Sequence, residues 1–396
     1  MTSFNKSILN SEIQDFINNH VNSDIAELAL KGLPFPDHLK QDIITQIEAK
    51  KRCEKKLSTW FNTPNIYFPS KLNIEQTSSE VTAQYKANLV SGQSLIDLTG
   101  GFGVDSLYFS KKVNAVIHCD INKALSNIAE YNASVLQVKN IEFYASNGIE
   151  VLSQTYHTLD WIYVDPSRRD DLKGKVFLLK ECLPNIPEHL TMLFKHSKNI
   201  LIKTSPLLDI SSGINELQNV KTIHCVAVNN EVKELLWVLE ENFKGDIEIR
   251  TSNLKNGENQ QFNFILNNEN IEDAEYSLPL TYLYEPNAAI LKSGAFNSVA
   301  NTFNIYKLHK HSHLYTSTNL INFPGRIFKI DNTINYNKKE FTKHIGFKQA
   351  NVTSRNFPEA VTQIRKKLKI KDGGKHYLFF TTDLNHSKIV ISCSKL

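Results

Sequence analysis

The residues best suited to chemistry lie in a glycine-rich segment, DLTGGFGVD, which runs from Asp97 to Asp105. An apolar run ends at Asp97 and a helical pattern begins near Asp105, so the sequence predicts a strand, a turn and a helix. Gly100, Gly101 and Gly103 allow positive φ angles and a close approach of the backbone to a ligand. We therefore expect this segment, called the glycine loop below, to hold a cofactor.

Two kinds of cofactor suit the glycine loop. A dinucleotide needs GxGxxG with its pyrophosphate at the helix N-terminus, and Gly101, Gly103 and Ser106 match that spacing only approximately. S-adenosylmethionine carries no phosphate but presents an ammonium, a carboxylate and a sulfonium, so an acidic residue at the strand end, such as Asp97, is useful to it. The loop alone leaves both cofactors open.

Polar residues also follow the next two expected strands. Asp120 ends AVIHCD, where a carboxylate accepts hydrogen bonds from both ribose hydroxyls of an adenosine, a contact common to the two cofactors. Ser146 and Asn147 follow IEFYA, where a polar side chain meets the adenine amine, although a helix cap explains them equally well. The expected cofactor contacts are Asp97, Thr99, Gly100, Gly101, Gly103, Asp120, Ser146 and Asn147.

The segment DPSRR, which follows the strand pattern WIYVD, discriminates between the two cofactors. A strand-end Asp-Pro places a carboxylate and a stiffened backbone at the carboxyl edge of the sheet, beside the reactive methyl of S-adenosylmethionine. Arg168 and Arg169 offer bidentate hydrogen bonds to a phosphate or a base edge, whereas a simple turn leaves two consecutive arginines unexplained. We predict a catalytic site of Asp165, Pro166, Arg168 and Arg169.

A later strand pattern, NILIKT, ends at the same edge of the expected sheet. Lys203 and Ser205 would face the substrate there. A strand-to-helix turn with a serine cap is the alternative explanation.

These motifs require a sheet that brings strand ends together. Strands alternate with helices up to Thr204, which is typical of a parallel sheet with helices on both faces, and later runs predict an antiparallel edge. The Asn-rich residues 253–275 indicate a polar hairpin or linker. The expected domains are an N-terminal helical domain (1–75), a cofactor-binding domain (76–273), a small ferredoxin-like α+β segment (274–320) and a basic α+β domain (321–396).

Charge is distributed unevenly along the chain. Residues 321–396 hold fifteen Lys and Arg against five Asp and Glu, so this tail carries +10 and the remainder −6 of the total of +4. Such asymmetry favours a polyanion partner at the C-terminal end. The stretch IRKKLKIKDGGKH, with Arg365, Lys366, Lys367 and Lys369, would form a phosphate-binding stripe, although a solvated helix face is the simpler explanation.

Other features exclude several classes of protein. Five dispersed cysteines without a CxxC pair argue against a zinc ribbon or a disulfide framework. His309, His311 and His313 lie close together, but they lack a carboxylate or thiol at ligand spacing, so we expect no metal. No apolar run could span a bilayer and no secretion signal begins the sequence. We expect a cytoplasmic protein.

Taken together, DLTGGFGVD, HCDIN and VDPSRR resemble motifs I, II and IV of class I S-adenosylmethionine-dependent methyltransferases. The segments TSSEVTAQYKA, IKTSPLLD, YEPNAAILKSGAF and SRNFPEAVTQIRKKLKIKDGGKHYLFFTT are similar to bacterial class I methyltransferases with a THUMP-like C-terminal domain. This resemblance covers nearly the whole chain. It implies a Rossmann-like α/β sheet, mostly parallel with an antiparallel edge, between an N-terminal helical segment and a small α+β THUMP-like domain.

The resemblance also implies roles for particular residues. By this resemblance, the residues that contact the cofactor are Asp97, Gly101, Gly103 and Asp120. Methyl transfer takes place at Asp165 and Pro166. The stretch from Gln84 to Lys86 resembles the segment that packs over the methionine end of the cofactor. Thr99 departs from the family pattern, which has glycine there; Gly100 beside it keeps the loop permissive.

The acceptor is partly constrained by what the motifs lack. Carbon-5 methylation of a pyrimidine needs a cysteine nucleophile, and neither DPSRR nor KTSP contains one. Sites for adenine amines resemble Asn/Asp-Pro-Pro-aromatic, and here Ser167 and Arg168 replace the last two residues. A ring nitrogen or the exocyclic amine of guanine remains a possible methyl acceptor, with Asp165 accepting a proton or orienting the amine.

THUMP domains bind RNA, so the resemblance implies tRNA or rRNA as the substrate. The RNA contacts we expect are Lys203, Ser205, Arg365, Lys366, Lys367 and Lys369. An NAD-dependent oxidoreductase and a non-catalytic RNA-binding protein that retains the fold are the alternatives.

Overall fold

The protein, described here from a computed structural model, forms two compact units. The structure describes residues 4–168 and 178–396. The first unit is Met1–Lys221 with Leu236–Lys244, and the second is Thr222–Leu235 with Gly245–Leu396. The predicted Arg169 lies outside the described residues, as do the side-chain contacts of Arg168.

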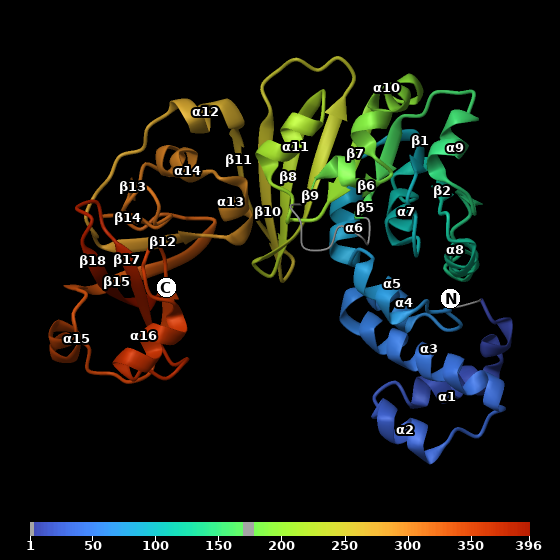
Figure 1. Ribbon diagram of the computed structural model, residues 1–396, viewed down its shortest axis with the longest axis horizontal. Helices are drawn as coiled ribbons and strands as arrows, with labels where there is room; N and C mark the ends of the chain where they lie inside the picture. The colour runs from blue at the N-terminus through green and yellow to red at the C-terminus, as the bar shows by residue number, and fades with distance from the viewer. Residues whose placement is uncertain (1–3, 169–177) are drawn as a thin grey trace. The chain divides into compact units, whose positions relative to one another are not determined.

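Helices make up the N-terminal part of the first unit (Figure 1). Several begin at a side chain that caps the first turn: Asp24, Ser70 and Ser79 each accept a backbone N–H from the residue three positions later. The helices are η1 (Lys6–Leu9), α1 (Ser11–Asn19), α2 (Ile25–Lys31), α3 (Asp37–Lys56), α4 (Ser58–Asn62), α5 (Lys71–Gln76) and α6 (Glu80–Ala87).

The predicted alternation of strands and helices follows. Its elements are β1 (Gly92–Asp97), α7 (Val104–Phe109), β2 (Val113–Cys119), α8 (Lys123–Val135), β3 (Ile141–Tyr144), α9 (Gly148–Ser153), β4 (Trp161–Val164), β5 (Ser167–Arg168), η3 (Leu179–Glu181), β6 (Cys182–Leu183), α10 (Ile186–His196), β7 (Asn199–Thr204), α11 (Ile210–Glu216), β8 (Val220–Val228) and β9 (Glu231–Glu240). β5 and β6 pair with each other as a separate two-stranded sheet.

The large sheet has the strand order β11-β10-β8-β9-β7-β4-β1-β2-β3. β1 pairs in parallel with β2 and β4, and these pair in parallel with β3 and β7. β10 (Glu248–Lys255) and β11 (Glu258–Ile265) form an antiparallel hairpin at the edge. The mostly parallel sheet with an antiparallel edge is therefore confirmed, and the turn of the hairpin and all of β11 lie within the Asn-rich segment.

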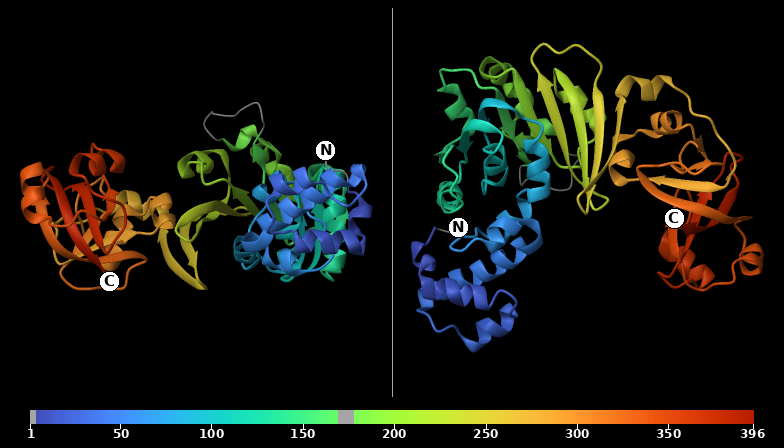
Figure 2. Two further views of the ribbon diagram at one scale, coloured as in Figure 1. Left: turned by 90° about the horizontal axis from the view of Figure 1, so that it is seen from below. Right: turned by 180° about the vertical axis from the view of Figure 1, so that it is seen from behind.

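The second unit contains a separate seven-stranded sheet, orange to red in Figure 2. Its order is β13-β14-β12-β15-β18-β17-β16. The remaining elements are α12 (Leu266–Ile271), β12 (Tyr282–Pro286), α13 (Ala288–Ser293), α14 (Phe296–Phe303), β13 (Tyr306–Lys307), β14 (Tyr315–Ser317), β15 (Gly325–Asn335), α15 (Lys338–His344), β16 (Asn351–Ser354), α16 (Val361–Leu368), β17 (His376–Thr382) and β18 (Lys388–Lys395).

Two apolar clusters stabilise this second sheet. One joins Phe341 of α15 and Ile364 of α16 to Phe380 of β17. The other contains Leu283 and Phe328. Successive strand residues face opposite sides, so the sheet has a core on each face. Among the described residues, no helix is both long and apolar enough to cross a membrane.

Candidate active site

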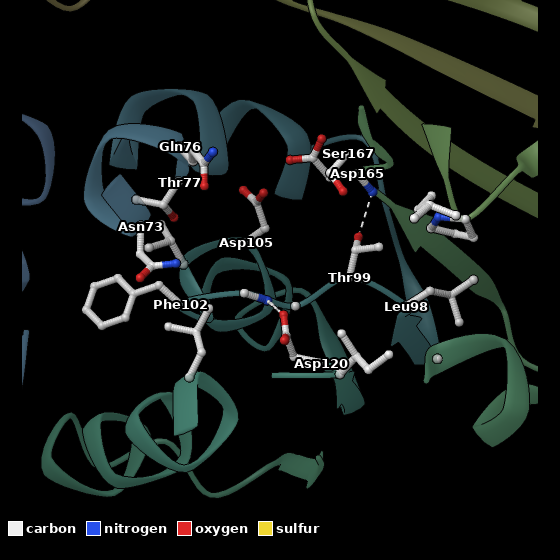
Figure 3. Close-up of a pocket in the computed structure, with 18 of the residues that line it drawn as sticks. Asn73, Gln76, Thr77, Leu98, Thr99, Phe102, Asp105, Asp120, Asp165 and Ser167 are labelled. Carbon is white, nitrogen blue, oxygen red and sulfur yellow. Dashed lines mark hydrogen bonds between the residues drawn. The ribbon is translucent and has the colours of Figure 1, made fainter. Parts of the chain in front are cut away.

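A cavity of about 460 Å³ lies at the carboxyl edge of the parallel strands in the first unit (Figure 3). This is the edge at which open α/β sheets bind ligands, and the volume suits a small organic molecule. Its described lining comes from the α5–α6 junction, from the loops after β1, β2, β3 and β4, and from the end of β6. The lining residues are Asn73, Gln76, Thr77, Ser78, Leu98, Thr99, Gly100, Gly101, Phe102, Val104, Asp105, Asp120, Ile121, Leu125, Asn147, Gly148, Ile149, Asp165, Ser167, Leu183 and Pro184.

The glycine loop packs directly on β2. The Gly100 N–H donates to the Cys119 carbonyl at 2.8 Å, and a Cβ at Gly100 would lie 2.0 Å from Cε1 of His118. Only glycine fits this contact. The Gly101 N–H donates to Oδ2 of Asp120 at 2.8 Å (Figure 3), and Gly103, at φ 83°, is the N-cap of α7. The loop thus exposes its backbone to the cavity, as the sequence predicts.

Asp120 lies on the cavity wall after β2, where the sequence predicts a ribose contact. Burial raises the pKa of its carboxyl above the ordinary value, and the N–H groups of Asn122 and Gly101 offset only part of that effect. Asn147 also lines the cavity, and its Oδ1 accepts the Ile149 N–H, so it caps α9 as well. Ser146 and Gly103 do not belong to the described lining.

Asp97 lies beneath the glycine loop rather than on the cavity wall. It is 1% exposed, its Oδ1 accepts the Thr99 N–H at 3.0 Å, and its Oδ2 accepts the Ser106 hydroxyl at 2.6 Å. Burial raises the pKa of this carboxyl to about 8. Asp97 is therefore not among the described lining residues, and its side chain faces inward, where it fixes the shape of the loop.

His118, below Gly100, makes stability sensitive to acid. Burial lowers the pKa of its imidazole to about 3 from 6.5. Between these values the unfolded chain binds a proton that the folded chain excludes, so the free energy of unfolding falls as the pH drops from 6.5 toward 3, by up to about 1.4 kcal/mol per pH unit. His118→Asn should flatten this dependence in urea titrations from pH 6.5 to 4.5. If the free energy of unfolding changed equally with pH in the two proteins, His118 would not be the source of the acid sensitivity. The raised pKa of Asp97 makes stability fall as the pH rises, which is the opposite effect, but Asp97 is present in both proteins.

Asp105, at the end of the glycine loop, also lines the cavity, and a buried network holds its side chain. Its Oδ2 accepts the hydroxyls of Ser78 and Tyr163, both at 2.8 Å. Its Oδ1 lies 3.2 Å from Nζ of Lys86, which is fully buried and also donates to Ser78 at 3.0 Å. Lys86 therefore holds Asp105 and Ser78 in place without itself lining the cavity. Gln84 to Lys86, the segment expected over the cofactor, are not among the described lining residues, whereas Asn73, Gln76, Thr77 and Ser78 are.

Asp165 also lines the cavity and is held from two sides. Its backbone N–H donates to Oγ1 of Thr99 at 2.7 Å (Figure 3). Its Oδ2 accepts from Nζ of Lys203 at 2.6 Å. Thr99, the departure from the family pattern, thus links the glycine loop to the Asp-Pro motif. Pro166 is buried and is not part of the described lining, whereas the exposed Ser167 is.

Lys203 and Ser205 have separate roles. Lys203 of β7 pairs with Asp165, although its own side chain is not among the described lining residues. The Oγ of Ser205 accepts the Leu207 N–H at 3.2 Å. Ser205 therefore makes the local turn that the sequence offered as the alternative.

The basic residues of α16 are partly paired with acids. Arg365 bonds Asp372, and Nζ of Lys367 lies 2.9 Å from Glu359 and over the Tyr336 ring. Lys366 and Lys369 are exposed, and neither forms an ion pair with the described residues. Of the four residues of the predicted phosphate-binding stripe, Lys366 and Lys369 are thus the ones that form no ion pair with the described residues.

The three neighbouring histidines lie in the loop between β13 and β14. His309 contacts His386 through ring nitrogens 3.3 Å apart and accepts from the Asn356 amide, while His313 stacks on Phe296. In the parts of the chain that the structure describes, no group of three or more His, Cys, Asp or Glu is arranged to hold a metal.

Sequence patterns gave little indication of residues 73–78. They contribute Asn73, Gln76, Thr77 and Ser78 to the cavity wall from an element outside the sheet. The available signal was the family-like segment TSSEVTAQYKA, which begins with Thr77 and Ser78. No sequence signal indicated that Leu183 and Pro184, at the end of β6, would line the cavity.

Known proteins resemble both the C-terminal part and the whole chain. Residues 282–324 match the model of a ferredoxin-like domain family, and residues 325–395 match that of a THUMP domain-like family. A crystal structure of a candidate methyltransferase from Porphyromonas gingivalis W83 is 30% identical, with a TM-score of 0.90 and 100% of each chain covered.

A curated relative matches a shorter region. An uncharacterized RNA methyltransferase from Mycoplasma mobile is 28% identical over 130 residues, which are 32% of this chain and 35% of that protein. The match thus spans about a third of that relative.

The likeness to the Porphyromonas gingivalis structure extends over both complete chains, and the C-terminal matches agree with the resemblance found in the motifs. The chain belongs to the family of class I S-adenosylmethionine-dependent methyltransferases that carry a C-terminal THUMP-like domain.

Proposed function

We propose that this methyltransferase modifies a base nitrogen of tRNA or rRNA, with guanine the favoured base, in the cytoplasm. The observation that carries the chemistry is the carboxylate of Asp165, fixed on the cavity wall by Thr99 and Lys203. RNA as substrate is supported by the THUMP-like match and by the name of the Mycoplasma mobile relative.

The cavity offers complementary groups to each part of S-adenosylmethionine. Asp120 suits the ribose hydroxyls, Asn147 and Ile121 lie where an adenine would fit, and Asp105 and Thr77 suit the amino-acid end. The glycine loop brings backbone close to the ligand without a Cβ in the way. When bound, this cofactor supplies an activated methyl group on a sulfonium.

Asp165 provides the acceptor end of the site. Held at 2.6 Å by Lys203 and through its backbone by Thr99, its carboxylate can accept a proton from the base nitrogen or orient it. Positioning of the two reactants contributes much of the acceleration, because the donor is already activated.

Salt dependence tests the proposed RNA contact of α16. Lys366→Ala combined with Lys369→Ala removes two exposed cations, so the slope of log affinity for tRNA against log salt should become shallower by about 1.5. Lys367→Ala is the matched control on the same helix, because its ammonium is already paired with Glu359. Fluorescence anisotropy from 50 to 300 mM KCl measures the affinity of each variant for tRNA. Identical slopes for the double variant and the wild type would refute a contact between α16 and RNA.

A direct test of the proposed function combines cofactor binding with methyl transfer. Isothermal titration should detect S-adenosylhomocysteine and not NAD, and purified enzyme should transfer labelled methyl groups to tRNA or rRNA that lacks the modification. Binding of S-adenosylhomocysteine and RNA without any transfer would favour a non-catalytic RNA-binding protein.

A further inference from the structure

The charge arrangement around Asp165 restricts the kind of atom that can accept the methyl group. Nζ of Lys203 lies 2.6 Å from Oδ2 of Asp165, so a cation stands directly beside a carboxylate of the cavity wall. Their side chains are 17% and 29% exposed, so both are partly shielded from water while still reachable. A substrate edge placed here meets a hydrogen-bond donor next to an acceptor.

We propose, building on the proposed function, that Lys203 and Asp165 together recognise the lactam edge of guanine and direct the methyl group to N1. Asp165 accepts the N1 proton, and Lys203 donates to O6. The second oxygen of the carboxylate is then available to the N2 amine. Bases taken out of a helix are commonly recognised at this edge.

The transfer is balanced for atoms and charge. The N1–H proton moves to the Asp165 carboxylate, and the N1 electron pair forms a bond to the methyl carbon. The bond from that carbon to the sulfonium breaks with its electrons going to sulfur, which gives S-adenosylhomocysteine. As N1 loses its proton, negative charge is shared with O6, where the Lys203 ammonium stabilises it.

Other nitrogens fit this pair less well. An exocyclic amine of adenine or cytosine gains positive charge as it accepts the methyl, and the neighbouring Lys203 cation opposes that change. An adenine-amine site would also use an aromatic ring, but among the described lining residues the aromatic side chain is Phe102, on the glycine loop. Uracil N3 is flanked by two carbonyls, one of which would face the Asp165 carboxylate.

A lysine at this position therefore has a testable catalytic role. With tRNA and rRNA from a strain that lacks the gene, Lys203→Met should lower kcat about 100-fold, the cost of one lost donor to a developing oxyanion. Its KM for RNA and its affinity for S-adenosylhomocysteine should change less than three-fold. The pH profile of kcat should also move to higher pH, because N1 deprotonation loses its cation. Lys203→Arg keeps the positive charge, so its kcat should be at least ten-fold higher than that of Lys203→Met.

Substrate variants identify the atom. Nuclease digestion and mass spectrometry of wild-type product should give N1-methylguanosine. A transcript with inosine in place of guanosine keeps O6 and N1–H but lacks the N2 amine, and it should still be methylated, at N1. Methylation at N2, at an adenine or at a ribose hydroxyl would overturn the proposal while leaving RNA methylation intact, and absence of any RNA methylation would overturn both.

Discussion

Replacing Asp165 by asparagine is expected to lower the rate of methyl transfer to RNA about 1000-fold, within the range found for the loss of a general base. The substitution removes the carboxylate that faces the cavity but keeps the shape of the side chain and the backbone bond to Thr99. Affinity for S-adenosylhomocysteine should therefore stay within about two-fold of wild type, since loss of catalysis without loss of binding marks an interaction of the transition state.

The measurement for Asp165→Asn is single-turnover transfer of labelled methyl groups, with calorimetry for cofactor affinity. Asp209→Asn is a matched control, because Asp209 caps α11 outside the described cavity lining and asparagine caps helices equally well. A variant at Asp165 that retained more than a tenth of the wild-type rate would show that the carboxylate is not the proton acceptor.

Replacing Gly100 by alanine is expected to weaken cofactor binding strongly and to destabilise the first unit. The new Cβ would lie 2.0 Å from Cε1 and 2.1 Å from Nδ1 of His118, whose ring is buried and cannot retreat. Overpacking of this kind costs about 1–3 kcal/mol, or more where backbone must move. Because the loop must shift away from β2, affinity for S-adenosylhomocysteine should fall at least 100-fold.

Thermal unfolding and calorimetry measure the effect of Gly100→Ala. Gly346→Ala is the control, since a Cβ there meets nothing within 4 Å and its φ is ordinary. Wild-type melting temperature and affinity in the Gly100 variant would contradict the close packing of the glycine loop on His118.

The sheet and its edge motifs could be predicted because their signals are local. Each strand is a short apolar run that ends at a polar or glycine-containing turn, and parallel strands bring such turns to one edge. Thus Gly100, Gly101, Asp120 and Asp165 all lie on the cavity wall, and their contacts with a cofactor or substrate stay predictions. The hairpin of β10 and β11 was likewise indicated by turn residues within the Asn-rich segment.

What the sequence did not reveal depends on the direction of single side chains and on distant contacts. Asp97 and Asp105 both flank the glycine loop, yet one points into the core and the other toward the cavity. The contact between Thr99 and Asp165 joins residues 66 positions apart. Lys86 lies in an ordinary helical pattern, so nothing in it indicated a buried partner of Asp105.

The most direct test of RNA methylation is a comparison of modified nucleosides in total tRNA and rRNA from wild-type and deletion strains. Complementation with the wild-type gene and with the Asp165→Asn gene completes the comparison. We predict that one methylated guanosine disappears in the deletion strain, returns with the wild-type gene and stays absent with the variant. Identical nucleoside profiles in wild-type and deletion strains would contradict RNA methylation by this enzyme.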